Sequence, residues 1–235
     1  MLHSTASIFT DLGGRFVISP ENFIEKLAHI RAFVFDWDGV FNDGQKSESG
    51  SSNFNELDSM GTNLLRFGWW LPQKQMPYTA IISGERNHIS FQLVQREHHH
   101  ACYFRIKHKI EALEHFMQMH HLKYNQIAFF FDDALDLSIA KICGLRIMIK
   151  HSGNPLFQKY VIEHNLADYI TAQEGGNFAI SESSELLLGM ANIHDQVINE
   201  RIKFYPYSNA YLAQRQQIES VFFTVENGNI IPQRV

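Results

Sequence analysis

The chain has 235 residues and a mass of 27.2 kDa, which suits one α/β domain with additions. Its net charge of −5 argues against a nucleic-acid-binding protein, which would normally be basic. No apolar run approaches the roughly 18–20 residues of a membrane span, and the first residues lack the basic start and apolar stretch of a signal peptide. Because Cys102 and Cys143 lie in apolar contexts, we expect buried free thiols in a cytoplasmic protein rather than a disulfide.

Strand and helix patterns alternate along most of the chain. Residues 20–30 predict an amphipathic helix with Ser19 as its N-cap, and the apolar run 32–36 predicts a strand buried on both faces. The polar segment 44–57 predicts an exposed hairpin or loop. The series continues with helices over 60–71, 87–97, 108–120, 134–142 and 155–165 and with strands over 78–83, 101–104, 127–131 and 145–149.

This alternation with short connections is typical of an α/β fold with a doubly wound parallel sheet. The tail differs, because a charged helix at 192–202 is followed by a β-hairpin signal at Asn227–Gly228. We therefore expect an N-terminal extension with one helix over 1–30, a core over 31–190 and a C-terminal extension over 191–235.

Carboxylates gather where two of the predicted strands end. In "FVFDWDGVFNDG" (33–44), Asp36 and Asp38 project to the same side of an extended chain, and "FFFDDALD" follows a second buried strand with Asp132, Asp133 and Asp136. The carboxyl ends of parallel strands meet at one edge of a sheet, so Asp36 and Asp132 should lie close together. Like charges that close need a cation, and hard oxygen ligands favour Mg²⁺.

Several of these patterns also have ordinary structural explanations. An acidic pair alone is more often a turn or a helix cap than a ligand site, but Ser83 and Lys109 lie between the two pairs and make a site the better interpretation. The histidines at 98–100 are consecutive and converge poorly, so we expect a solvated helix end rather than a metal cluster. The stripe Trp69, Trp70 and Leu71 is expected in the core or in a subunit interface.

The stretch "FDWDGVFNDG" resembles the first motif of the haloacid dehalogenase (HAD) superfamily of phosphatases. The resemblance continues in the family's order through "AIISGERN", "KIEAL", "FFFDDALDLSIAKICGLRIMI" and "ADYITAQEGGNFAISESSELLLG", and it covers residues 32–189. It is strongest to the cap-less branch that contains 3-deoxy-D-manno-octulosonate 8-phosphate (KDO 8-phosphate) phosphatase. The resemblance implies a HAD-like, Rossmann-like α/β core with a small hairpin insertion and no large cap domain.

The resemblance also implies a two-step hydrolysis of a phosphate ester. Asp36 would attack phosphorus and form an aspartyl-phosphate. Asp38 would protonate the leaving group and then deprotonate the attacking water. Lys107 competes for the role of the phosphate-binding lysine, but Lys109 is preferred because it stands directly before "IEAL". The groups expected on the phosphoryl oxygens are therefore Ser83, Gly84 and Lys109.

The cofactor that the resemblance implies is Mg²⁺. It would be held by the carboxylates of Asp36 and Asp132 and by the backbone carbonyl of Asp38. Asp133 and Asp136 would support these ligands without contacting the metal.

Departures from the family pattern bear on the substrate. Leu57 stands where the family has an arginine, Phe131 replaces a glycine, and Glu85 followed by Arg86 shifts another arginine by one place. The segment "GGNFAISE" (175–182) lacks two further arginines of the family pattern. Because arginine suits bidentate binding of a carboxylate, these losses should weaken recognition of an acidic sugar phosphate and leave the substrate open.

Two other classes of protein fit parts of the sequence. A non-catalytic interaction protein on a HAD scaffold would have no reason to keep the complete set of motif side chains. A response-regulator-like receiver also carries a phosphorylatable aspartate on a doubly wound sheet, but it would lack D-x-D-G and be much shorter. We therefore expect an enzyme acting on a small phosphorylated substrate, with no nucleic-acid or membrane partner. Since no segment is long enough to form a cap, we also expect a homo-oligomer, with a tetramer favoured.

Overall fold

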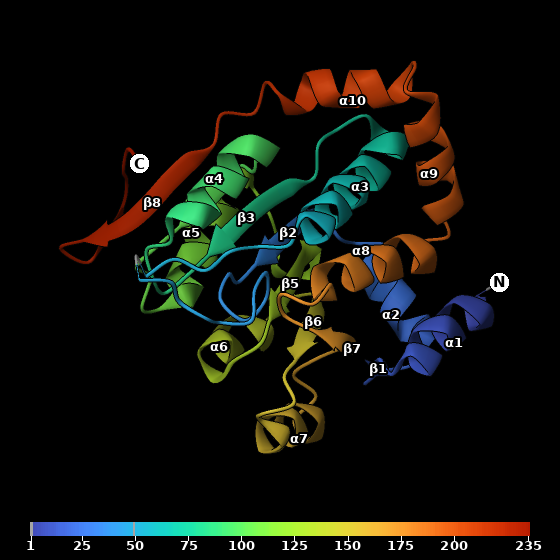
Figure 1. Ribbon diagram of the computed structural model, residues 1–235, viewed down its shortest axis with the longest axis horizontal. Coiled ribbons are helices and arrows are strands. Elements are labelled where there is room, and N and C mark those ends of the chain that lie inside the picture. The colour runs from blue at the N-terminus through green and yellow to red at the C-terminus, as the bar shows by residue number, and fades with distance from the viewer. Residues whose placement is uncertain (1, 49) are drawn as a thin grey trace.

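The computed structural model of the protein describes residues 2–48 and 50–235. Within them, the strands form one nine-stranded sheet in the order β1-β7-β6-β5-β2-β3-β4-β8-β9 (Figure 1). The inner strands are parallel, and the edge strands β1 and β9 are antiparallel to their neighbours. The strands are β1 Arg15–Phe16, β2 Ala32–Phe35, β3 Tyr78–Ile82, β4 Ala101–Tyr103, β5 Ile127–Phe131, β6 Leu145–Lys150, β7 Tyr169–Glu174, β8 Val221–Glu226 and β9 Asn229–Pro232.

The order of the strands confirms the predicted doubly wound sheet. From β2 the chain moves outward through β3 and β4, and it then crosses to the other side of β2 to form β5, β6 and β7. The direction of winding therefore reverses between β2 and β5. The carboxyl ends of the strands at such a reversal border the crevice in which doubly wound folds bind ligands.

Helices cover both faces of the sheet, because the inner strands are apolar on both sides. On one face, Phe33 and Phe35 of β2 belong to a core formed with α1 to α4 and α8 to α10. On the other face, Ala32 and Val34 belong to a core formed with α5, α6 and α7. The longer helices are α1 Leu2–Leu12, α2 Pro20–Leu27, α3 Glu56–Gln73, α4 His88–Glu97, α5 Lys109–His120, α7 Pro155–Glu163, α8 Ala179–Met190, α9 His194–Lys203 and α10 Tyr207–Arg215, and the short ones are η1 Tyr124–Gln126, η2 Ala134–Asp136 and α6 Leu137–Ala140.

Both ends of the chain contribute strands to the same sheet. β1 pairs with β7, and β8 pairs in parallel with β4, so β8 extends the sheet in Figure 1. The hairpin expected at Asn227–Gly228 is confirmed, since β8 and β9 pair across it. The expectation of a single helix within residues 1–30 is corrected, because α1 precedes α2. α1 has no acidic residue in its first turn and no basic residue in its last, so it lacks the charge pattern that marks helix ends.

Of the two alternatives expected for the segment after β2, a hairpin or a loop, the described residues form the loop. Residues 44–48 and 50–55, the described part of this segment, contain no strand and follow an irregular path. A hydrogen bond of 2.8 Å from the Ser47 N–H to the Ser51 carbonyl closes part of the loop, which lacks the alternating apolar residues of a strand pair. α3 begins at Glu56, earlier than predicted, because the side chain of Asn55 caps it by accepting the Leu57 N–H at 2.9 Å.

The expectation of a solvated helix end at residues 98–100 is wrong. His98 ends α4 in a left-handed conformation, and the chain then turns directly into β4. The side chain of His99 is consequently 0% exposed, with its ring 6.4 Å from the ring of Phe35. The Nδ1 atom of His100 accepts the Thr79 N–H at 3.1 Å. These rings therefore pack against the central sheet instead of facing solvent.

Other expectations about the core are confirmed. Trp70 and Leu71 of α3 are buried, while Trp69 is partly buried against the same core. Cys102 and Cys143 are buried free thiols. Among residues 2–48 and 50–235, no helix is both long and apolar enough to cross a membrane.

Candidate active site

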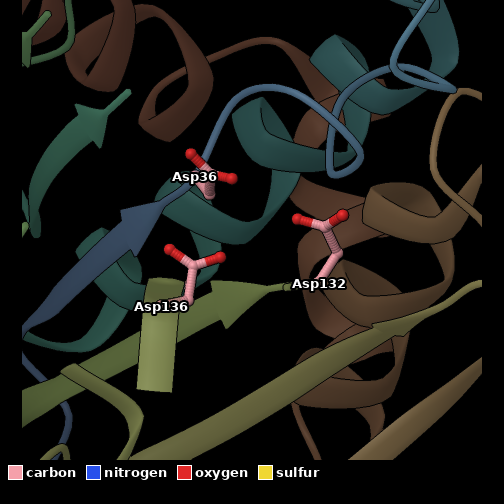
Figure 2. Close-up of side chains that lie close together, drawn as sticks. All are labelled: Asp36, Asp132 and Asp136. Atoms are coloured by element: carbon pink, nitrogen blue, oxygen red, sulfur yellow. The ribbon is translucent and has the colours of Figure 1, made fainter. Parts of the chain in front are cut away.

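Three carboxylates converge at the carboxyl edge of the sheet, beside the reversal between β2 and β5 (Figure 2). Asp36 follows β2 directly, Asp132 follows β5 directly, and Asp136 ends the short helix η2 that comes next. One oxygen atom from each side chain lies within 4.8 Å of the others. Asp136 is 0% exposed, and Asp36 and Asp132 are also buried. The register of parallel strands thus brings together residues almost a hundred positions apart, as the sequence predicts.

Lys109 joins this group from the first position of α5. Its Nζ lies 2.8 Å from Asp36 Oδ1 and 2.6 Å from Asp136 Oδ1, and its side chain is buried. The competing candidate, Lys107, is exposed. The geometry therefore places Lys109, and not Lys107, beside the carboxylates.

The charges of this buried group do not balance. Three carboxylates face the Lys109 ammonium, and His151 is the one other group that can bring positive charge, next to Asp132; the carboxylates therefore exceed the cations whether or not His151 is protonated. Burial, reinforced by repulsion from Asp136, raises the pKa of Asp36 well above its ordinary value despite the nearby ammonium. Burial likewise raises the pKa of Asp132, and that of Asp136 to about 6. Burial would lower the pKa of Lys109, but the carboxylates outweigh it and hold the pKa above the ordinary value, so this lysine stays charged.

Two carboxylate oxygens of the group are buried without a hydrogen-bond partner. They are Asp132 Oδ1 and Asp136 Oδ2, and no described residue donates to either. An unpartnered buried oxygen is costly, and in native proteins it calls for an explanation such as an ion or a ligand. The oxygens available here are hard ligands of the kind that Mg²⁺ and similar cations prefer.

Asp38 lies apart from the three converging carboxylates. Its Oδ1 accepts the Ser52 hydroxyl at 2.7 Å, and its Oδ2 lies 2.5 Å from Lys46 Nζ. Both partners come from the loop between β2 and α3, so this loop folds back over Asp38. The sequence analysis expects only the backbone carbonyl of Asp38 to hold the metal, so the position of this side chain does not bear on that expectation. It expects Asp136 behind the ligands, whereas the structure brings the side chain of Asp136 into the group.

His151 is a site residue that the sequence analysis did not identify. It follows β6, and its Nε2 lies 3.1 Å from Asp132 Oδ2 and 3.0 Å from the carbonyl oxygen of Gly39. The hydrogen bond to Asp132, which outweighs partial burial, raises the pKa of His151. The available signal was position: like Asp36, Ser83 and Asp132, it is the first residue after an inner strand.

Gly39 is required by both its conformation and its surroundings. Its φ of +82° lies in the left-handed region, and a Cβ at this position would be 2.0 Å from Asp132 Oδ2. The loop after β2 can therefore pass this close to Asp132 only with glycine here.

The remaining predicted residues lie around this group. Ser83 follows β3 and is buried, and its Oγ accepts the Glu85 N–H at 3.2 Å. Gly84 beside it is exposed. Asp133 caps η2, its Oδ1 accepting the N–H groups of Leu135 at 2.7 Å and Asp136 at 3.3 Å. Asp133 therefore holds Asp136 in place, in keeping with a supporting role.

An open pocket of about 390 Å³ lies at the site. This pocket is lined by Asp38, Gly39, Asp43, Gly44, Asp132, Asp133, His151, Gly153 and Asn154. Its volume falls in the range of roughly 300–1,000 Å³ that small-molecule sites occupy.

No protein-family model and no curated protein matches the chain, whereas several solved structures do. A probable YrbI family phosphatase from Pseudomonas syringae pv. phaseolica is 27% identical, with a TM-score of 0.65, over 77% of this chain and 98% of its own. The KDO 8-phosphate phosphatase of Moraxella catarrhalis, solved with magnesium, phosphate and KDO, is 24% identical with a TM-score of 0.63, over 76% and 97%. A cobalt-bound deoxy-D-mannose-octulosonate 8-phosphate phosphatase from Haemophilus influenzae is 21% identical with a TM-score of 0.60, over 80% and 99%.

These similarities extend over whole phosphatases, because each neighbour is covered almost completely. The two neighbours under 25% identity support the fold alone. The phosphatase from Pseudomonas syringae, at 27% identity, adds similarity of sequence. In this chain the same fold carries the strand-end carboxylates and the buried lysine, in the order in which the motifs were recognised. The chain is an enzyme of the HAD phosphatase type, and it resembles the branch that contains KDO 8-phosphate phosphatase.

Proposed function

We propose that the protein is a Mg²⁺-dependent phosphomonoesterase that hydrolyses a small phosphorylated metabolite through an aspartyl-phosphate on Asp36. The observation that carries this proposal is the buried group of Asp36, Asp132 and Asp136 around Lys109, with its excess of negative charge. A divalent cation would balance that charge. Phosphate transfer needs such positive charge, because negative charge spreads over the phosphoryl oxygens in the transition state.

The residues present fit a hard divalent metal. Asp36 and Asp132 would hold it, together with the backbone carbonyl of Asp38, and the unpartnered Oδ1 of Asp132 is one oxygen free to do so. The structure favours adding Asp136 to this set, since its Oδ2 is also unpartnered. When bound, the metal supplies positive charge for the phosphate and neutralises repulsion among the carboxylates.

The protein's own residues divide the chemistry between them. A carboxylate oxygen of Asp36 forms a bond to phosphorus as the bond between phosphorus and the ester oxygen breaks. Asp38 gives its proton to the departing oxygen and then takes a proton from the water that hydrolyses the aspartyl-phosphate. Lys109, Ser83 and Gly84 hold the phosphoryl oxygens during both steps. Lys109 is well suited to this, because its ion pairs fix its position on a rigid helix.

The substrate class that we propose is a sugar phosphate, similar to KDO 8-phosphate in that the scissile group is a phosphate monoester. The neighbouring structure from Moraxella catarrhalis supports this class by its ligands. Leu57 is 59% exposed at the start of α3. An arginine at this position would suit the carboxylate of an acidic sugar, so leucine leaves open whether the sugar is acidic or neutral. Phosphate release from a panel of neutral and acidic sugar phosphates, with and without Mg²⁺, would identify the preferred type.

The decisive experiment compares two variants with two leaving groups. Asp36→Asn should form no phosphoenzyme, because a neutral amide is a poor nucleophile. Asp38→Asn should release a burst of about one phenol per active site from an aryl phosphate, which needs no protonation to leave, and then turn over slowly. The same variant should fail at the first step with a sugar phosphate. Rapid-quench kinetics measure both steps.

Two results of this experiment would contradict the proposal. Equal residual rates for both leaving groups without a burst would make Asp38 a support and not the proton carrier. No phosphate release from any substrate by the unmodified protein would favour the non-catalytic HAD-scaffold protein instead.

We also propose a cytoplasmic homo-oligomer, with a tetramer favoured. The pocket at the site is open, and the loop over residues 44–55 is too short to act as a separate cap. A neighbouring subunit would exclude water from the site. A strictly monomeric species in light scattering at working concentration would contradict this.

Within each subunit, residues 31–190 would carry the catalytic groups, and residues 1–30 and 191–235 would support them by completing the sheet.

A further inference from the structure

A second cavity lies at the opposite end of β2 from the carboxylates. It has a volume of about 450 Å³, is partly open to solvent, and is lined by α1, α2, α3 and the junction between α8 and α9. Arg31, the residue immediately before β2, reaches it, so the cavity borders the amino edge of the sheet. Its main lining residues are Ile24, Leu27, Arg31, Trp69, Met190 and Ile193.

The wall of this cavity is mainly apolar; Thr5, Gln73 and Asn192 are its uncharged polar residues, and Arg31 is its one charged residue. No described carboxylate lies within 4.0 Å of the Arg31 guanidinium, which takes part in none of the ion pairs. Its Nη1 donates to the Ile30 carbonyl oxygen at 2.9 Å, and this bond positions the side chain. The Nε and Nη2 groups have no acceptor among residues 2–48 and 50–235 and remain available to a ligand.

Trp69 gives the cavity a fixed aromatic wall. Its indole Nε1–H donates to the Ile30 carbonyl oxygen at 3.2 Å, and its ring packs edge-on against Phe33 at 5.1 Å. The polar edge of the indole is therefore already satisfied. What remains beside Arg31 is an apolar surface, provided by Trp69 and by aliphatic side chains such as Leu27.

We propose that this cavity binds a small amphipathic carboxylate, with the carboxylate on Arg31 and an apolar chain between the helices. A guanidinium presents donors in a fork that matches a carboxylate. A pocket of this volume with apolar walls and one convergent charged group is typical of a small-molecule site. The charge of Arg31 selects an anion, and the apolar wall excludes strongly hydrated ones such as free inorganic phosphate. This site does not depend on the proposed phosphatase chemistry.

The test uses the full chain and decanoate as the probe, with decanol as its uncharged counterpart. Isothermal titration calorimetry should give saturable binding of decanoate and weaker binding of decanol. Arg31→Gln should weaken decanoate binding at least about tenfold, because a hydrogen bond to a charged group contributes about 1.5–3 kcal/mol. The same variant should leave decanol unaffected, and Arg31→Lys should restore part of the loss for decanoate.

Two further variants separate the cavity from the rest of the surface. Ala28→Phe places a ring into the cavity from the exposed end of α2 and should abolish binding of both probes. Arg234→Gln removes the same charge from an exposed position near the C-terminus and should change nothing. Circular dichroism establishes whether each variant is folded. If Ala28→Phe does not fold, the binding measurements on Arg31→Gln are sufficient to test the proposal.

Three outcomes would overturn the proposal. The first is the absence of saturable decanoate binding to the unmodified protein. The second is equal binding of decanoate by the unmodified protein and Arg31→Gln. The third is an oligomer whose mass in light scattering falls with Ala28→Phe, because the cavity would then be filled by a second copy of the chain.

Discussion

Buried carboxylates lie at both edges of the sheet, and they differ in how completely their hydrogen bonds and charges are satisfied. Asp168, just before β7, is 0% exposed and accepts four hydrogen bonds. They come from Lys26 Nζ at 2.7 Å and from three nitrogens of Arg146 at 2.6–3.0 Å. At the carboxyl edge, Asp132 and Asp136 are buried as well, but each keeps an oxygen without a partner.

The difference separates a structural carboxylate from a functional one. Two cations surround Asp168, so its charge is balanced when the protein folds, and it ties α2 to β6 and β7. The group around Lys109 remains unbalanced after folding, which lowers stability and is retained only where something outside the chain completes it. Burial alone therefore does not identify the candidate site; the convergence of several carboxylates with unpartnered oxygens does.

Removal of divalent metal should have the largest effect on this contrast. We expect EDTA to abolish phosphatase activity and Mg²⁺ to restore it, because the proposed mechanism requires an added cation at the carboxyl-edge group. Binding at a hundredfold excess over Kd should also raise the free energy of unfolding by about 2.7 kcal/mol. Calorimetry with and without Mg²⁺ measures this. Full activity in excess EDTA would contradict the assignment.

Paired substitutions should dissociate stability from activity. Asp168→Asn should lower the free energy of unfolding by about 3 kcal/mol, because it leaves two partly buried cations without their partner. Its kcat per folded molecule should be unchanged. Asp136→Asn should change metal-free stability by less than about 1 kcal/mol, since Asp36 still pairs with Lys109 and repulsion is relieved.

Urea unfolding and steady-state kinetics on both variants measure these quantities. In addition, Asp136→Asn should lose activity and most of the stabilisation by Mg²⁺. If Asp136→Asn proved as destabilising as Asp168→Asn, the carboxyl-edge group would be structural and the distinction between the two edges would fail.

Asp58 provides a sharper version of the comparison, away from the carboxyl-edge group. It is buried in the first turn of α3, where its Oδ1 accepts the Ser181 N–H at 2.8 Å and its Oδ2 has no partner in the described chain. Burial raises its pKa to about 6. The folded state therefore holds this proton more tightly than the unfolded state, and stability contributed by the protonated form is lost as pH rises toward and through about 6.

Asp58→Asn should remove this loss. Above pH 7 the variant should be more stable than the unmodified protein by up to about 3 kcal/mol, and near pH 4 the two should differ little. Thermal unfolding across this pH range in EDTA measures the difference. An advantage of Asp58→Asn that stayed constant with pH would show that the effect is not one of ionisation.

The sequence predicted the parts of the site that depend on local pattern and strand order. An apolar run that ends in aspartate marks Asp36 and Asp132, and the convergence of parallel strands places them together. The sequence analysis expected Asp136 behind the metal ligands, whereas its side chain lies among the converging carboxylates. Its position depends on the short helix η2 and its cap, Asp133, which no pattern in the sequence indicated. His151 was missed because "KHSGN" has the composition of an ordinary turn.

The fold was predictable to a similar extent. The central alternation of strands and helices was recognised from its apolar periodicity. The pairing of β8 with β4 and of β1 with β7 was not, because pairing between distant segments depends on tertiary contacts that no local pattern encodes. The burial of His99 is of the same kind: it follows from the tight connection between α4 and β4.

The smallest expected effect concerns Lys46, which pairs with Asp38 in a partly exposed position. An ion pair of this exposure contributes less than about 1 kcal/mol and is screened by salt, so Lys46→Ala should leave the thermal midpoint almost unchanged. Its position beside Asp38 still adds positive charge near an anionic substrate. We therefore expect kcat/KM to fall by less than about fivefold at low ionic strength and not at high ionic strength. Lys159→Ala, which breaks an exposed pair with Glu163 at 2.9 Å on α7, is the matched control and should change neither quantity. A large loss of stability in Lys46→Ala would instead show that this loop stabilises the fold, and that Asp38, like Asp168, has a structural role.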